Sequence, residues 1–140
     1  MRLLASTVLL LALPALAAEL TVEPGLWAFE VESRNPFLPA PVIQRFRDCV
    51  ESRRLEPSRF LQDLGDCTWE EEELRSDELA WTFRCDTHNG AAEGNGRMRS
   101  TGTTLEGRLE IAIDTPGAER PLTLVNRWEG RRVAATCDDQ

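Results

Sequence analysis

The fold is decided by the stretch Cys67-Thr-Trp-Glu-Glu-Glu-Glu-Leu-Arg-Ser-Asp-Glu-Leu-Ala-Trp-Thr-Phe-Arg-Cys85. Two runs that contain strand-forming residues flank a polar turn, and each run carries a tryptophan. A cysteine stands at each outer end, where facing residues of a hairpin come within disulfide reach. We therefore predict a β-hairpin over residues 67–85, closed at its open end by a disulfide.

The register of this hairpin is only partly consistent with its sequence. Pairing the two end cysteines puts Trp69 opposite Phe83, which is a favourable aromatic pair across two strands. The same register puts Glu71 opposite Trp81, which suits a buried face poorly. A bulge within the glutamate run 70–73 would remove the conflict, and so would a different pairing of the cysteines.

Four cysteines, at positions 49, 67, 85 and 137, can form two disulfides in three ways. We favour Cys67–Cys85 together with Cys49–Cys137, because the first bond joins the facing ends of one hairpin. The pairing Cys49–Cys67 with Cys85–Cys137 stays open. A structural zinc site is disfavoured, because the spacings contain no C-x-x-C pair.

The segment before the hairpin reads as further strands. In residues 26–32, Trp27, Phe29 and Val31 alternate with small or charged residues, which is typical of a half-buried strand. Residues 42–50 read as a second strand. A short helix is expected at 58–64, with Ser58 as its N-cap, and it must pack on the sheet because it is too short to stand alone.

The segment after the hairpin is divided by turn residues. We expect a glycine-rich strand at 91–100, in which the glycines mark bends, and a better strand at 104–115. A final hairpin is expected from 121–128 and 131–137, turning at Glu129-Gly130. The fold class is therefore all-β, with about seven or eight strands. The bond Cys49–Cys137 would tie the second strand to the last, so we expect one strongly curved antiparallel sheet, a half-barrel or barrel.

The N-terminus has the features of a secretory signal peptide. A positive start at Met1-Arg2 precedes a short apolar run, and Ala15-Leu16-Ala17 matches an A-x-A cleavage site. We predict cleavage after Ala17, with cleavage after Ala18 as the alternative. We expect the remaining residues, 18–140, to form a single disulfide-stabilised β domain with a frayed tail at 138–140. No membrane-spanning segment is expected after cleavage.

The charge balance excludes some partners. The chain has 16 Lys and Arg, all of them Arg, against 24 Asp and Glu, so its net charge is −8. Binding to nucleic acid is not expected, because phosphate contacts need clustered positive charge. An anionic lipid surface is a poor partner for the same reason.

No catalytic constellation stands out, so we expect no enzyme. His88, the one histidine, lies in an expected surface turn and no nucleophile motif accompanies it. The glutamates at 70–73 point to alternate faces of a strand, so they cannot converge on a cation. Arg131 and Arg132 with Arg127 suggest an anion site, but pairing with carboxylates is the plainer interpretation. No cofactor and no metal are expected.

These features together resemble the DUF3617 family, small exported bacterial proteins of unknown function. The resemblance rests on Pro24-Gly25-Leu26-Trp27, Asp66-Cys67, Trp81–Cys85, the glycine-rich strand, and Gly130-Arg131-Arg132 followed by Cys137. It covers nearly all of residues 18–140. The chain departs from the family pattern in its glutamate run and at Ala134-Ala135, where a glycine is expected. The resemblance implies a periplasmic location and disulfides, and it brings no catalytic residues.

The function expected is that of a non-catalytic binding or accessory module, with a small apolar ligand. Its candidate ligand-facing side chains are the aromatics of the expected sheet, since ligand pockets are mostly apolar. These are Trp27, Phe29, Trp69, Trp81, Phe83 and Trp128. The alternatives are that they only fill the core, or that the protein has an envelope-structural or protein–protein role.

Overall fold

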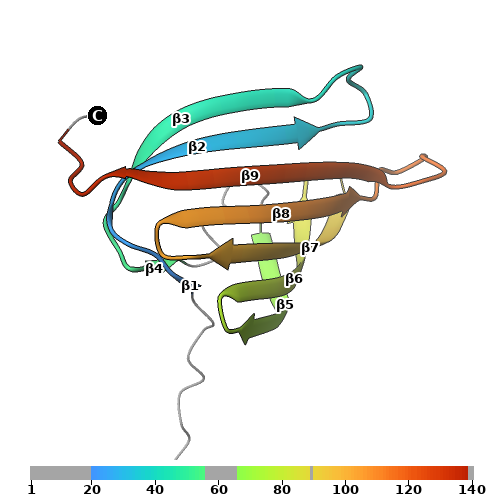
Figure 1. Ribbon diagram of the computed structural model, residues 1–140. Coiled ribbons are helices and arrows are strands. Elements are labelled where there is room, and N and C mark those ends of the chain that lie inside the picture. The colour runs from blue at the N-terminus through green and yellow to red at the C-terminus, as the bar shows by residue number, and fades with distance from the viewer. Residues whose placement is uncertain (1–19, 56–65, 89, 139–140) are drawn as a thin grey trace, which may run out of the picture.

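The computed structural model describes residues 20–55, 66–88 and 90–138 (Figure 1). The strands are β1 (Leu20–Thr21), β2 (Gly25–Arg34), β3 (Val42–Val50), β4 (Arg54–Leu55), β5 (Asp66–Arg75), β6 (Glu78–Thr87), β7 (Gly90–Ser100), β8 (Thr104–Ile113) and β9 (Leu122–Ala134). The described residues contain no helix. The predicted signal peptide (1–17) and the predicted helix (58–64) lie outside them.

Seven of the described strands form one antiparallel sheet in the order β3-β2-β9-β8-β7-β6-β5. The all-β antiparallel prediction is thus confirmed. The prediction of a half-barrel or barrel is wrong: the sheet is open and not strongly curled, with β3 and β5 as its unpaired edges. Cys49–Cys137 does not draw those edges together, because it links the end of β3 to the residues after β9, and only β2 lies between β3 and β9.

The predicted hairpin is strands β5 and β6. Cys67 lies opposite Cys85 and Trp69 opposite Phe83, as the sequence suggested. The register then shifts between Trp69 and Glu71, which places a bulge at Glu70. The bulge puts Leu74 opposite Leu79, but a glutamate, now Glu72, still lies opposite Trp81, so the conflict is removed only in part. The disulfides are Cys67–Cys85 and Cys49–Cys137, the pairing that we favoured.

The predicted final hairpin is wrong. Residues 121–128 and 131–137 do not fold back at Glu129-Gly130, because β9 runs without a break from Leu122 to Ala134. One side of this long strand pairs with β2 and the other with β8. Gly130 faces Phe29 across the β2–β9 pair, and a Cβ there would lie 2.6 Å from Cε1 of that ring. The glycine therefore makes room for an aromatic ring instead of making a turn.

The same arrangement recurs at three other glycines within strands. Each lies directly opposite an aromatic residue of the neighbouring strand, and a Cβ on the glycine would collide with that ring. The pairs are Gly94 with Phe83, Gly96 with Trp81, and Gly107 with Trp128. These glycines are therefore places where an aromatic ring lies on the neighbouring backbone, and not simply the bends that the sequence suggested.

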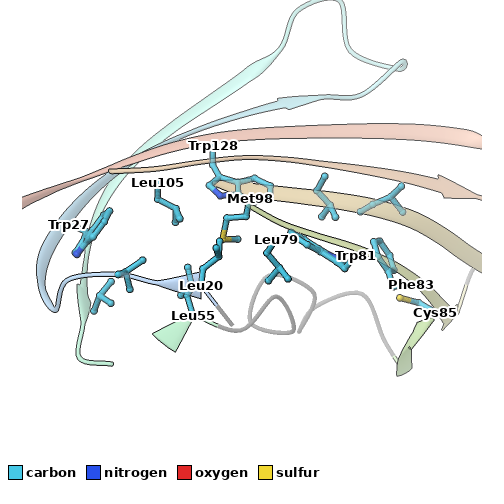
Figure 2. Packing of buried hydrophobic residues seen from close by; sticks show 14 of the residues in the cluster. Leu20, Trp27, Leu55, Leu79, Trp81, Phe83, Cys85, Met98, Leu105 and Trp128 are labelled. Carbon is cyan, nitrogen blue, oxygen red and sulfur yellow. The ribbon is translucent and has the colours of Figure 1, made fainter. Parts of the chain in front are cut away.

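The core lies on one face of the sheet. It contains the alternate apolar side chains of β6, β7, β8 and β9, which face Leu20 and Leu55 of the β1–β4 region (Figure 2). Val22, which follows β1, belongs to the same cluster. The strands β1 and β4 pair with each other. The Ser100 hydroxyl donates a hydrogen bond of 2.7 Å to the Thr21 carbonyl, which ties β1 to the end of β7. This small second layer closes one end of the core.

Candidate functional site

All six aromatics singled out from the sequence belong to the core face of the sheet, but they form two groups. Trp81 and Phe83 are fully buried, and Trp69 packs edge-on against both, at centroid distances of 6.3 Å. This first group fills the core under β5 and β6. The interpretation that the aromatics only fill the core is therefore sufficient for these three.

The second group lines a cavity. Trp27 and Phe29 of β2 and Trp128 of β9 form part of the wall of a space of about 310 Å³. Its lining is Val22, Trp27, Phe29, Val31, Phe46, Asp48, Val50, Leu55, Leu105, Leu109, Asn126 and Trp128. Its volume lies at the lower end of the range found for ligand pockets, and most of its lining is apolar, as is usual there.

A row of stacked rings forms one side of the cavity. The ring centroids of Trp27 and Phe29 are 6.1 Å apart, and those of Phe29 and Phe46 are 5.3 Å apart. Trp27 is buried, Phe29 is half-buried, and the Phe46 side chain is 47% exposed. The cavity therefore opens to solvent at β3, the edge of the sheet.

The ring of Trp27 is held by hydrogen bonds around the turn that precedes β2. Its indole Nε1 donates to the Glu23 carbonyl at 2.9 Å. Arg132 of β9 donates from Nε to the Pro24 carbonyl at 2.8 Å. These bonds connect the turn to β9, and Gly130 leaves room for Phe29 beside it. The inner wall is thus preformed, which lowers the ordering cost of binding a ligand.

Two polar side chains, Asp48 and Asn126, belong to the lining. In the β2 register, Asp48 lies opposite Trp27 and Asn126 lies opposite Ser33, so they stand near opposite ends of the cavity, roughly 20 Å apart along the strand. One carboxylate oxygen of Asp48 accepts the backbone N–H of Cys49 at 2.9 Å. The Asn126 amide makes no hydrogen bond within the described residues. Asn126 therefore lies among apolar side chains, and its amide N–H and C=O groups are available to hydrogen-bond a ligand.

Sequence reasoning missed several lining residues. The sequence places Phe46 on a strand but does not mark it as a ligand-facing aromatic, because only the β2–β3 pairing brings it against Phe29. Leu55 and Val22 come from the β1–β4 layer, which the sequence did not indicate. The alternation of residues 42–50 was the one available signal, since it puts Phe46 and Val50 on one side.

The other candidates from the sequence are not brought together. His88 is exposed at the end of β6. Arg127 and Arg131 lie on the face of β9 that is opposite Arg132, so the three arginines do not converge. Within the described residues, no three His, Cys, Asp or Glu side chains gather as they would around a metal ion. No helix in that part of the chain is long and apolar enough to cross a membrane.

Comparison with known proteins leads to a family and not to an activity. A search of curated proteins and a search of solved structures found no match. A scan of family models matched residues 22–137, from Val22 of the core to Cys137, the last cysteine. The matched region contains every strand from β2 to β9 and all four cysteines. The chain therefore belongs to the DUF3617 family, which is described as a protein of unknown function.

Proposed function

We propose that this protein is a non-catalytic binding module that holds one small apolar molecule in the cavity between β2, β3, β8 and β9. The observation that carries the proposal is the cavity itself, a preformed and largely apolar space with an aromatic wall and an open side at β3. A core that served stability alone would be expected to close such a space, because protein interiors pack to crystal-like density.

The shape and polarity of the cavity narrow the ligand class. An elongated molecule would lie along the Trp27–Phe29–Phe46 wall, with its apolar body against these rings. The neutral amide of Asn126 both donates and accepts, so it suits a ligand with a hydroxyl, carbonyl or similar neutral group. We therefore expect the apolar ligand to carry one neutral polar group at its end, as a long-chain alcohol does.

The setting proposed for this binding is the periplasm. The two disulfides support an oxidising environment outside the cytoplasm. The signal peptide expected at residues 1–17 supports export. The intact mass of the unreduced protein tests both points, because cleavage after Ala17 removes a defined mass and each disulfide removes two hydrogens. A mass that retains residues 1–17 would contradict export by a cleaved signal.

Fluorescence of a neutral apolar probe, N-phenyl-1-naphthylamine, tests the site. The mature protein should enhance the probe's emission, and Val31→Trp should reduce binding at least tenfold by filling the cavity. Val125→Trp is the matched control, because Val125 lies on the opposite face of the sheet and should leave binding unchanged. Equal loss in both variants, or none in Val31→Trp, would sink the proposal.

The role of Asn126, at the polar end of the cavity, is tested separately. 1-Dodecanol should displace the probe from the unsubstituted protein. Asn126→Leu should weaken this displacement by about five- to tenfold, because a net hydrogen bond contributes about 1 kcal/mol. Probe binding itself should change little, since the apolar wall stays intact. An unchanged affinity for 1-dodecanol would remove Asn126 from the site while leaving the apolar cavity standing.

A further inference from the structure

Strand β3 has an unusual surface for an edge strand. Of seven large hydrophobic side chains that are exposed in the described residues, five lie between positions 37 and 46, in β3 and the loop before it. These are Phe37, Leu38, Val42, Ile43 and Phe46. One edge of β3 pairs with β2, and the other edge has no strand partner within the described residues. The backbone N–H and C=O groups of that second edge are therefore open to another strand.

The opposite edge of the sheet is built differently. Strand β5 carries a bulge at Glu70 and a run of four glutamates, and both features discourage pairing with another chain. Strand β3 pairs with β2 without a register shift over all nine residues. It contains no acidic residue before Asp48. One edge is therefore protected against strand addition and the other is not.

We propose that β3 is the contact between two copies of this chain, which pair their β3 strands antiparallel about a two-fold axis perpendicular to the sheet. The inference goes beyond the proposed ligand binding and does not depend on it. Such an axis keeps the core face of both copies on one side. The two sheets then form one continuous sheet through the dimer.

The charges of β3 select the register. If the two-fold axis passes through Arg45 or Arg47, that arginine lies opposite the same arginine of the second copy. If the axis passes through Phe46, Arg45 of each copy lies opposite Arg47 of the other. Like charges that face each other directly destabilise a strand pair. Centres at Gln44 and at Ile43 both avoid these contacts, but a centre at Ile43 pairs only residues 42–44 of β3. A centre at Gln44 pairs residues 42–46 of both copies and is therefore favoured.

In the Gln44-centred register, the apolar residues also match. Val42 of each copy lies opposite Phe46 of the other on the core face, where both side chains are exposed in the single chain, by 42% and 47%. On the outer face Ile43 lies opposite the aliphatic stem of Arg45. Phe46 also lines the cavity, so Val42 of the second copy would cover the open side. That last consequence rests on the proposed function, whereas dimerisation does not.

Sedimentation velocity of the mature, disulfide-bonded protein without ligand tests the proposal. The protein should shift from monomer to dimer as its concentration rises. Ile43→Arg should weaken the dimer at least about tenfold, because it puts two new Arg–Arg pairs across the axis. Ile43→Glu should retain the dimer, because its carboxylate faces Arg45 of the other copy. Adding Arg45→Glu to Ile43→Arg should restore association.

The paired variants separate this register from a general effect of charge at an exposed edge. A charge of either sign would disrupt non-specific contacts, so loss of the dimer in both Ile43→Arg and Ile43→Glu overturns the proposal. Leu74→Arg on β5 is the control for the other edge, and loss of the dimer there would also overturn it. A protein that stays monomeric at all concentrations would likewise overturn the proposal. If that monomer sediments with phospholipid vesicles, the exposed residues of β3 contact a membrane instead.

Discussion

At the scale of single residues, the pairing of glycine with an aromatic ring across two strands is the recurring device. Gly94, Gly96, Gly107 and Gly130 each face a large ring on the adjacent strand, and a side chain would occupy the place of that ring. Glycine normally weakens a strand. Here the ring covers the exposed backbone and fills the space, which accounts for four glycines inside regular strands.

Replacing Gly94 by Ala tests this interpretation. The new methyl group would collide with the backbone carbonyl oxygen of Glu110, and it would lie 2.6 Å from Cζ of Phe83, a core side chain that is only 1% exposed. We expect the free energy of unfolding to fall by about 1–3 kcal/mol, which is typical of overpacking. Urea unfolding followed by tryptophan fluorescence measures the change.

Asn95→Ala is the control for that substitution. Asn95 is the next residue of β7, exposed on the other face, and its replacement should change the free energy of unfolding by less than about 0.5 kcal/mol. If Gly94→Ala instead stabilised the protein, the ring would not need the glycine, and the glycine would be present for another reason.

At the scale of elements, the β5–β6 hairpin combines a disulfide, an aromatic cluster and a bulge. The disulfide Cys67–Cys85 and the pair Trp69–Phe83 keep one end in the expected register. The bulge at Glu70 then changes which residues of β5 face the core, so that Leu74 lies opposite Leu79. One extra residue thus reconciles two segments whose alternation is out of phase.

Deleting Glu70 should give a regular hairpin that still pairs Cys67 with Cys85 and Leu74 with Leu79. It should also flatten the β5 edge and remove a charge, so we expect more self-association through that edge. Light scattering across a concentration series measures this. Glu70→Thr keeps the extra residue and serves as the control for the lost charge. Equal association of both variants would show that charge, and not the bulge, protects β5.

At the scale of the whole molecule, an open sheet with one covered face has a modest core, and two covalent links support it. On the chain-entropy model, a link across a separation of 18 residues contributes about 3 kcal/mol, and one across 88 residues roughly 4 to 5 kcal/mol. Together these are comparable with the whole stability of a typical domain, about 5–15 kcal/mol.

Reduction should therefore unfold most of the protein at physiological temperature. Guanidinium unfolding with and without a phosphine reductant should show a large drop in the midpoint concentration. A variant with all four cysteines replaced by alanine should be as destabilised as the reduced protein, and it serves as the control because the reductant should not change its unfolding curve. An unchanged midpoint for the reduced parent protein would mean that packing alone holds the sheet.

The sequence predicted what local patterns and covalent chemistry can encode. Alternation showed that Trp27, Phe29 and Val31 share a face, and hairpin geometry favoured Cys67–Cys85. The choice of Cys49–Cys137 followed as the remaining pair. The prediction failed at Glu129-Gly130, where a turn-like dipeptide lies inside a strand. A dipeptide carries no information about the Phe29 ring that lies on it.

The sequence by itself thus determined the fold class, the hairpin at residues 67–85, and the aromatic residues of the core face. Only the tertiary structure decided the order of the strands, the open edges, and the division of the aromatics between core and cavity. The physical reason is that alternation specifies which face of a strand is apolar, but not which strand lies next to it. The cavity depends on β2 pairing with β3 and with the distant β9, so its position is a property of long-range contacts.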